Sequence, residues 1–334
     1  MKAHVFHGPG DLRFEEMPVP EPALGEIVIR VEAALTFGTD VKVLRRGHPV
    51  MIPHVPTVFG HEFAGTVARL GRGVTTFREG DRVVAANSAP CGACRCCRSG
   101  RHNLCEDLLF VNGGYGEYLA LPPRLVATNV VRLGPSLPAR RAAFAEPLAC
   151  ALLGIERGRV EKGMTVAVIG SGTLGLLAVA LLSRVSPARL ALVGTRAPRL
   201  AFGLELGATE TWNVRRDQEP EPGFDLVFEA AGTVDGSRTA VALARRGGTV
   251  VLEGISGQSN GIDADVVVLG HLRVQGVFGA SRSAWRWVVG LFADGLLDTK
   301  PFVTHSFPLE QHDAAFRTLT DRSGDALKVQ LTPE

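Results

Sequence analysis

A glycine-rich turn in the middle of the chain constrains the fold more than any other feature. Its residues are Gly170, Ser171, Gly172, Thr173, Leu174 and Gly175. The turn follows the apolar segment 166–169, a predicted buried strand, and leads into segment 174–185, a predicted helix. Glycines at these three positions permit a tight turn and let the backbone approach a pyrophosphate at the helix N-terminus. The pattern therefore predicts a βαβ unit that binds a dinucleotide.

Strands and helices alternate on the carboxyl side of this turn. Further strands are expected at 190–193, 224–229, 249–252 and 272–277, with a helix at 198–206. Such alternation is typical of a parallel sheet that is covered by helices. The first 135 residues differ, because segments such as 26–33 and 63–70 carry β-branched residues between glycine-rich turns. The last 50 residues mix a predicted helix, 284–293, with a predicted strand, 326–331.

The end of the second predicted strand indicates which dinucleotide is bound. An acidic residue about 20 residues after the glycines would bind the ribose 2′-hydroxyl of NAD(H). Here the strand ends at Gly194, and Thr195, Arg196 and, three residues later, Arg199 follow. Gly194 leaves room, Thr195 offers a hydroxyl, and the guanidinium groups suit a phosphate. This favours NADP(H); the alternative is that both arginines are solvated surface residues, with Arg199 the weaker candidate.

The cysteines indicate a metal site. Five of the six lie between residues 91 and 105, and four of these, Cys91, Cys94, Cys97 and Cys105, have the spacing of a zinc-binding lobe. Four thiolates complete a tetrahedral Zn²⁺ and leave no open position for a substrate, so this zinc is expected to be structural. Cys96 breaks the spacing and is interpreted as a bystander. A clustered set in a chain without a signal peptide indicates a reducing compartment, the cytoplasm.

Charge and composition exclude several classes of partner. The chain of 334 residues has 36 Lys and Arg against 34 Asp and Glu, a net charge of +2. This balance argues against bulk electrostatic binding to nucleic acid or to a membrane. The longest apolar run, 176–182, is far shorter than the roughly 18–20 residues that cross a bilayer. A length of this size suggests two domains at about 150 residues each, and the expected partner is a small-molecule substrate.

Several motifs occur together in a characteristic order. They are Gly60-His61-Glu62, Gly80-Asp81-Arg82-Val83, the four-cysteine lobe, Gly116-Glu117-Tyr118, Glu146-Pro147-Leu148, the glycine turn and Lys328-Val329. In these motifs the chain resembles the zinc-containing medium-chain dehydrogenase/reductase family, the alcohol, polyol and threonine dehydrogenases, over essentially its whole length. The resemblance implies an α/β fold: a GroES-like β-rich catalytic domain (1–146 and 282–334, with the lobe at 91–105) and a Rossmann domain with a doubly wound parallel sheet (147–281). It places the active site in the cleft between them.

The resemblance also implies a catalytic zinc, and here the chain departs from the family. The family's ligands are a cysteine from a Cys-Gly-Thr/Ser-Asp motif, the histidine of Gly-His-Glu, and one or more carboxylates. The first motif reads Phe37-Gly38-Thr39-Asp40 in this chain, so Phe37 replaces the thiolate. The remaining set, His61, Glu62 and Glu146, offers only nitrogen and oxygen ligands.

Two neighbouring positions bear on proton transfer. The resemblance makes Thr39 the hydroxyl that contacts the substrate oxygen, and this residue is kept. Lys42 stands where members of the alcohol dehydrogenase type often carry a proton-relay histidine. The side chains considered as pocket walls or as core residues are Phe37, His48, Phe59, Tyr115 and Trp285.

Three functions remain open at this point. The first is an NADP(H)-dependent alcohol or polyol dehydrogenase or ketone reductase that holds zinc through His61, Glu62 and Glu146. The second is a reductase without catalytic zinc that acts on a carbonyl or a conjugated C=C, with Thr39, Lys42 or His61 as proton donor. The third is a non-catalytic NADP(H)-binding protein. The sequence does not indicate the substrate or the reaction direction.

The resemblance further implies a homodimer or homotetramer that pairs through the cofactor domain. Segments 266–269 and 272–278 are apolar, and we expect them to provide strand edges that would be exposed in a monomer.

Overall fold

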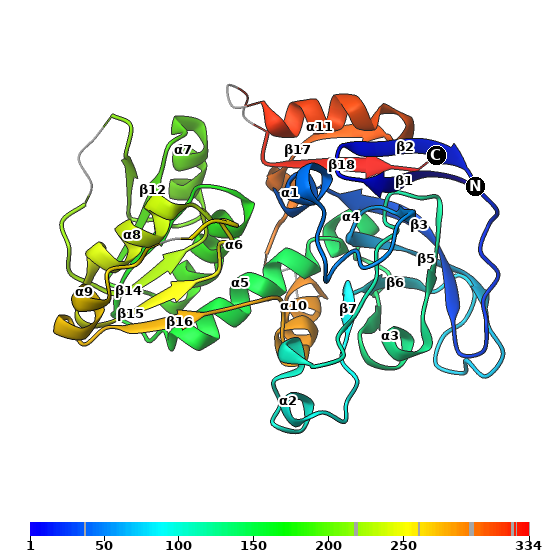
Figure 1. Cartoon of the computed structure of the whole chain (residues 1–334), viewed down its shortest axis with the longest axis horizontal. Coiled ribbons are helices and arrows are strands. Elements are labelled where there is room, and N and C mark those ends of the chain that lie inside the picture. The colour runs from blue at the N-terminus through cyan, green and yellow to red at the C-terminus, as the bar shows by residue number, and fades with distance from the viewer. Residues whose placement is uncertain are drawn as a thin grey trace. The chain divides into compact units, whose positions relative to one another are not determined.

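The computed structural model describes residues 1–36, 38–216, 220–259, 261–293, 297–321, 324 and 326–333. Phe37 therefore lies outside the described residues. The chain forms two compact units, Met1–Glu146 with Ser281–Glu334 and Pro147–Ala280 (Figure 1). Within the described residues, no helix combines the length and apolarity that crossing a membrane would require.

The first unit is rich in strands, as predicted. Its larger sheet has the order β10-β6-β5-β3-β18-β17, with β9 also pairing with β3. These strands are β3 (Ile27–Leu35), β5 (Glu62–Leu70), β6 (Arg82–Ala85), β9 (Tyr118–Leu121), β10 (Val130–Arg132), β17 (Val303–Pro308) and β18 (Lys328–Thr332). A smaller sheet joins β2 (Asp11–Glu16), β1 (Lys2–Gly8) and β4 (Thr57–Val58), and β7 (Ser88–Ala89) pairs with β8 (Leu109–Phe110). Segments from both ends of the sequence thus share one sheet.

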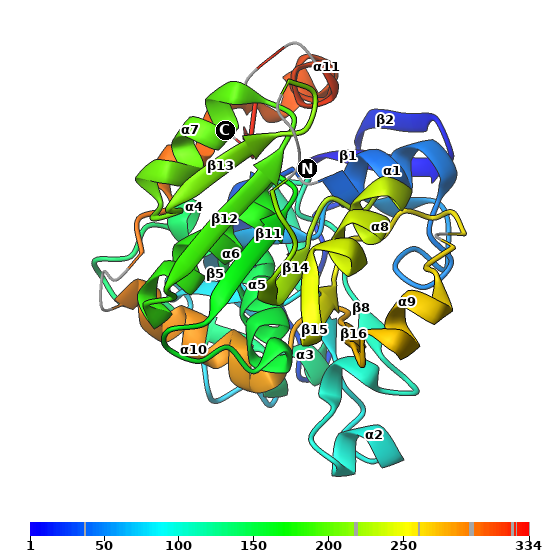
Figure 2. The same cartoon turned by 90° about the vertical axis from the view of Figure 1, so that its left-hand side faces the viewer.

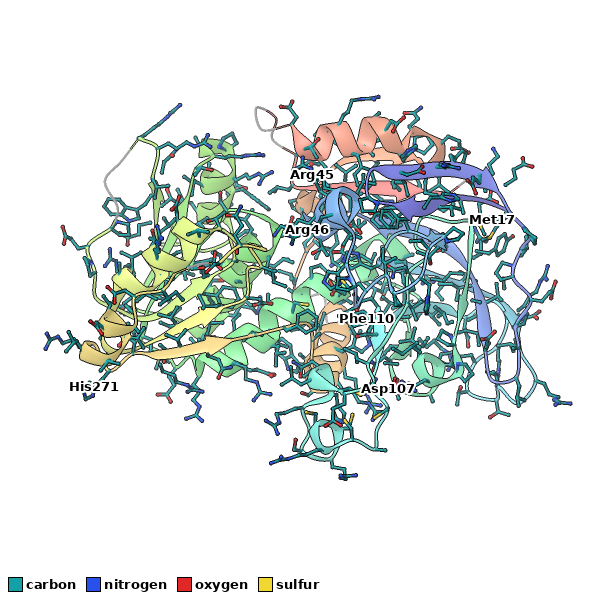
Figure 3. All side chains as sticks on the ribbon, in the orientation of Figure 1. Met17, Arg45, Arg46, Asp107, Phe110 and His271 are labelled. Carbon is teal, nitrogen blue, oxygen red and sulfur yellow. The ribbon has the colours of Figure 1, made fainter. Side chains whose placement is uncertain are left out.

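Helices complete the first unit. They are α1 (Gly38–Arg46), α2 (Arg95–Arg98), α3 (Pro123–Thr128), α4 (Ala139–Ala142), α10 (Arg282–Ala293) and α11 (His312–Thr320); α5 (Ala145–Gly158) begins here and continues into the second unit. The basic residues Arg45 and Arg46, labelled in Figure 3, lie in the last turn of α1, where positive charge is favourable.

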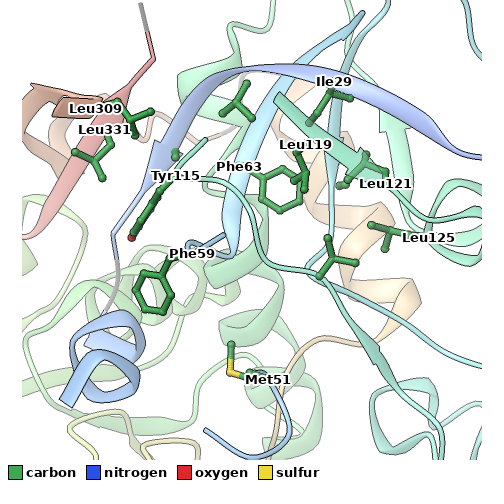
Figure 4. Close-up of a cluster of buried hydrophobic side chains, with 14 of the residues drawn as sticks. Ile29, Met51, Phe59, Phe63, Tyr115, Leu119, Leu121, Leu125, Leu309 and Leu331 are labelled. Atoms are coloured by element: carbon green, nitrogen blue, oxygen red, sulfur yellow. The ribbon is translucent and has the colours of Figure 1, made fainter. Parts of the chain in front are cut away.

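The core of this unit contains aromatic side chains that the sequence analysis considered either as pocket walls or as core residues. Phe59 is 1% exposed and Tyr115 is fully buried, and their rings meet edge to face with centroids 5.6 Å apart (Figure 4). Trp285 in α10 is also 1% exposed. These three residues are core, because their side chains are buried, whereas His48 is partly exposed.

The second unit is the predicted parallel sheet. Its order is β13-β12-β11-β14-β15-β16, and these strands pair in parallel with one another (Figure 2). The strands are β11 (Thr165–Ile169), β12 (Arg189–Gly194), β13 (Glu210–Asn213), β14 (Phe224–Glu229), β15 (Ala244–Leu252) and β16 (Arg273–Gly276), with helices α6 (Thr173–Leu182), α7 (Ala197–Glu205), α8 (Val234–Leu243) and α9 (Ala264–Leu269). Helix α6 is apolar along its length and nearly all of it is buried, as in a covered sheet.

Two details of this unit differ from the prediction. Segment 266–269, expected as a strand edge, belongs to helix α9, which begins after Asp263 because the Asp263 carboxylate accepts a hydrogen bond from the Asp265 amide at 2.9 Å. Strand β13, with the sequence Glu-Thr-Trp-Asn, was not predicted, since its polar composition gives no apolar run. It nevertheless pairs with β12 at the sheet edge.

Candidate active site

A buried histidine is held by an aspartate at the entrance to β5. His61 Nδ1 lies 2.8 Å from Asp40 Oδ1, and both side chains are less than 5% exposed. Asp40 stands in the first turn of α1, so the Thr-Asp pair of the predicted motif supplies the partner of His61. Such a bond fixes the ring and leaves Nε2 as the nitrogen that can bind a ligand.

The glycine before His61 has a steric reason. Gly60 has φ +90°, and a Cβ there would approach the Tyr115 ring to 2.4 Å. The buried Tyr115 hydroxyl donates to the Leu35 carbonyl at 3.4 Å. Burial, followed by the charge of Asp40, holds the pKa of Tyr115 well above its usual value. The Tyr115 ring therefore leaves no room for a side chain at position 60.

Glu62 forms a buried ion pair that sequence reasoning missed. Lys328 Nζ donates to Glu62 Oε2, and both side chains are fully buried. Strand β3 lies between them, because Leu35 pairs with Glu62 on one side and with Gln330 on the other. Burial raises the pKa of Glu62 to about 7, although the Lys328 ammonium opposes this shift. The two partners are 266 residues apart in the chain, so no local pattern indicates that they pair. The motif Lys328-Val329 was the one sequence signal that involved Lys328.

Three of the predicted ligands come together. One ligand atom from each of His61, Glu62 and Glu146 lies within 4.8 Å of the others. Among the described residues, the buried Glu62 Oε1 has no hydrogen-bond partner, which leaves it available to a metal. Burial alone would lower the pKa of His61, but Asp40 and then Glu146 and Glu62 raise it to about 9. An anionic environment of nitrogen and oxygen donors fits a divalent cation.

The predicted proton-transfer residues lie on the same helix as Asp40. Thr39 precedes Asp40 in the first turn of α1 and Lys42 lies two residues after it; both side chains are partly buried. Since α1 begins immediately after position 37, this short segment carries Thr39, Asp40 and Lys42 together.

The cysteine lobe brings its four predicted ligands together around α2. The Sγ atoms of Cys91 and Cys97 are 3.9 Å apart and those of Cys94 and Cys105 are 4.0 Å apart. A tetrahedral zinc with Zn–S bonds of about 2.3 Å separates its sulfurs by about 3.8 Å. Backbone amides of Glu106 and Cys97 lower the pKa of Cys94 to about 6, which favours the thiolate. The residues fit a structural zinc, and Cys96 is not in the set.

An ion pair adjoins this lobe. Asp107, labelled in Figure 3, accepts a hydrogen bond at 2.8 Å from Arg124 Nη2 at the start of α3. Because both side chains are substantially exposed, this pair contributes little stability.

Replacing Cys94 with serine is expected to remove about one zinc per chain and to lower the melting temperature, because a three-thiolate site cannot close the coordination sphere. Cys96→Ser is the matched control and should change neither quantity. Zinc content by atomic absorption and thermal unfolding check both variants. Loss of zinc from the Cys96 variant would show that the ligand set is wrong.

The glycine turn lies between β11 and α6, as predicted. A Cβ at Gly175 would approach the Gly170 carbonyl oxygen to 1.9 Å, whereas nothing lies within 4 Å of a Cβ at Gly172. The first turn of α6 therefore packs against the backbone of the glycine turn at Gly175. The open space at Gly172 lets a ligand approach the backbone. Helix α6 starts at Thr173, so its N-terminus faces the turn.

The end of β12 approaches the glycine turn at Gly194. A Cβ at this position would approach Ser171 Oγ to 2.5 Å, so the absent side chain makes room for Ser171 of the turn. Thr195 is exposed, and Arg196 and Arg199 are partly buried at the start of α7. The neighbouring β13 ends beside them, because the Val214 amide donates to the Gly194 carbonyl at 3.0 Å.

Comparisons with known proteins agree with this architecture. Residues 23–131 match the alcohol dehydrogenase GroES-like domain, and residues 173–294 match the zinc-binding dehydrogenase domain. The sorbitol dehydrogenase of Bacillus subtilis (strain 168) is 30% identical, with 100% of this chain and 97% of that protein covered. The L-threonine 3-dehydrogenase of Bacillus licheniformis is 33% identical, with 100% and 99% covered.

A solved structure extends the comparison. A protein of Sinorhizobium meliloti 1021, solved bound to NADP, superposes with a TM-score of 0.91 at 28% identity and covers 99% of each chain. The chain belongs to the zinc-containing medium-chain dehydrogenase/reductase family, and it is an oxidoreductase. Its fold is the predicted combination of a GroES-like domain and a Rossmann domain.

Proposed function

We propose that this oxidoreductase transfers hydride between NADP(H) and a small alcohol, polyol or ketone. The named activities of its relatives, sorbitol and threonine dehydrogenation, support an alcohol substrate. One observation carries the preference for NADP(H): β12 ends without an acidic residue and is followed by Thr195, Arg196 and Arg199. The NADP-bound relative from Sinorhizobium meliloti is consistent with this preference.

In this proposal each residue of the candidate active site has a separate chemical role. When bound, zinc at His61, Glu62 and Glu146 would polarise the substrate oxygen, and the nicotinamide would carry the hydride. Asp40 orients the His61 ring through its 2.8 Å contact. Thr39 moves the proton at the substrate oxygen, and Lys42 lies on the same helix. The four cysteines take no part, because their metal has no open position.

A second candidate, a reductase without catalytic zinc, is favoured by Phe37, which supplies no ligand where the family has a thiolate. In that case Thr39, Lys42 or His61 would donate the proton to a reduced carbonyl or conjugated C=C. Zinc stoichiometry per chain separates the two candidates. The third expectation, NADP(H) binding without catalysis, is set aside, because the chain is an oxidoreductase of a dehydrogenase family.

Arg196→Ala is expected to raise the Michaelis constant for NADPH about tenfold, or about 1.4 kcal/mol, because a guanidinium that pairs with the 2′-phosphate is lost. The constant for NADH should change little. Arg199→Ala, at the weaker of the two positions, should have a smaller effect. Steady-state kinetics with both cofactors check this result. An equal loss for NADPH and NADH would contradict the assignment of Arg196.

We propose that the protein is a homodimer or homotetramer that pairs through an apolar surface of its second unit, defined by α9 and β16. Its members are exposed by 36–73%: Val266, Val268, Leu269, Val274 and Phe278. Among the residues that the structure describes, β16 is an edge strand of the parallel sheet of the second unit. His271, labelled in Figure 3, marks the turn between α9 and β16. An apolar surface beside an open strand edge is typical of a subunit interface.

Leu269→Glu is expected to shift the protein toward the 35.5 kDa monomer, because a charge would be buried at the interface. Leu204→Glu, at a 47% exposed leucine of α7, is the matched control and should keep the wild-type assembly. Light scattering at micromolar concentration measures the mass of both variants. A monomeric wild-type protein would contradict the proposed assembly.

A further inference from the structure

The candidate metal site contains its own cation. Lys328 reaches Glu62 from β18 with its ammonium in contact with Oε2, and neither side chain has any solvent exposure. The Phe144 ring centroid lies 6.0 Å from Nζ, so an aromatic face also borders the ammonium. A buried ammonium persists only with such compensation.

The charges around this lysine are predominantly negative. Asp40 holds His61, and Glu62 and Glu146 lie with His61 in one cluster. Three carboxylates at a buried site repel one another unless cations balance them. A divalent metal would provide this balance, and Lys328 provides part of it from within the chain.

Lys328 and a metal would share one carboxylate. The lysine takes Oε2 of Glu62, while Oε1 has no hydrogen-bond partner among the described residues and is the oxygen left for a metal. Two cations that share a buried carboxylate repel each other, so the lysine stabilises the metal-free site and weakens the metal-bound one. This repulsion has a large effect on zinc affinity in this chain, because Phe37 replaces the thiolate that would otherwise strengthen zinc binding.

We propose that Lys328 is a positioning residue that acts as a substitute cation: it holds Glu62 in place when no metal is bound and thereby lowers the affinity of His61, Glu62 and Glu146 for zinc. The inference rests on the proposed metal site. It predicts a protein that stays folded with only its lobe zinc.

The test measures the second zinc on protein that already carries zinc in its lobe. Titration calorimetry with Zn²⁺ is expected to show about tenfold tighter binding to Lys328→Met than to the wild type, because the competing charge is gone. Lys328→Arg keeps the charge and should stay within about threefold of the wild type. The double variant Glu62→Gln/Lys328→Met should lose the gain, since Glu62 transmits it. Affinity in Lys328→Met that is equal to or weaker than that of the wild type would overturn the proposal.

Thermal unfolding keeps the test decisive if Lys328→Met is unstable. Zinc should raise the melting temperature of this variant more than that of the wild type, and an unfolded variant should regain its fold when zinc is added. A variant that remains unfolded with zinc, while the double variant folds, would show a purely structural lysine and overturn the proposal. Fluorescence titration with NADPH on the same samples tests the proposed cofactor separately, because the glycine turn lies in the other unit.

Discussion

Replacing Phe37 with cysteine is expected to raise the affinity of the candidate metal site for zinc by about a hundredfold or more, because a thiolate is a soft, charged ligand that the site lacks. The wild type, with one imidazole and two carboxylates, should keep at most one zinc per chain after mild chelation, the zinc of the lobe. The Phe37→Cys variant should keep two. Zinc per chain after dialysis against a chelator measures the difference.

A matched substitution tests whether the additional zinc is bound because the new thiol lies at position 37 or because any new thiol binds zinc. Phe202→Cys introduces a cysteine at a partly buried phenylalanine of α7 and should leave zinc content unchanged. Activity of the wild type should survive chelation better than that of the Phe37→Cys variant. Two chelation-resistant zinc ions in the wild type, with activity lost in step with the second, would instead establish a metal mechanism despite Phe37.

Acid is expected to destabilise the first unit through His4. The ring is fully buried, its Nε2 contacts the Leu309 carbonyl, and its centroid lies 4.0 Å from that of His312. Burial lowers the pKa of His4 from 6.5 to about 4, and the carbonyl only partly opposes the shift. The unfolded chain therefore binds the proton first, so stability is full above pH 6.5 and falls as the pH drops toward 4. The loss reaches about 3 kcal/mol.

Denaturant unfolding between pH 7 and pH 4 measures this loss. His4→Gln keeps a donor for the Leu309 carbonyl without a titrating ring, so its free energy of unfolding should depend less on pH. The charges of His312, Asp313 and Glu310 also act on this ring. The pKa values of His312 and Glu310 are themselves lowered, so these two groups leave a residual slope in the variant. His54→Gln, at an exposed histidine, should retain the full wild-type slope. A His4 variant with an unchanged slope would contradict the assignment.

Local sequence patterns predicted the features that depend on neighbours along the chain. The glycine turn, the strand before it and the helix after it follow from a few adjacent residues, and so does the spacing of the four cysteines. Family resemblance added the grouping of His61, Glu62 and Glu146. The glycine turn and the cysteine spacing are short motifs whose geometry the backbone dictates, whereas the grouping of Glu146 with His61 came only from the resemblance.

Features that depend on tertiary pairing were missed for a physical reason. The Glu62–Lys328 contact forms because β5 and β18 lie on either side of β3. No local sequence pattern predicts which strands are neighbours in the sheet. Segment 266–269 is apolar in either a strand or a helix, so the capping Asp263 decided between them. Tyr115 is a core residue because its ring packs against Gly60, a residue distant in the chain.

The insertion of the second unit between the two parts of the first has a consequence during synthesis. Glu62 leaves the ribosome 266 residues before Lys328, a delay of about 13–53 s at about 5–20 residues per second. Residues Pro147–Ala280 are contiguous and can fold in this interval, whereas β3 still lacks β18 as a neighbour. The nascent first unit therefore holds a carboxylate without its ammonium and an unfilled sheet position, and chaperones or ribosome-associated factors would meet it in that state.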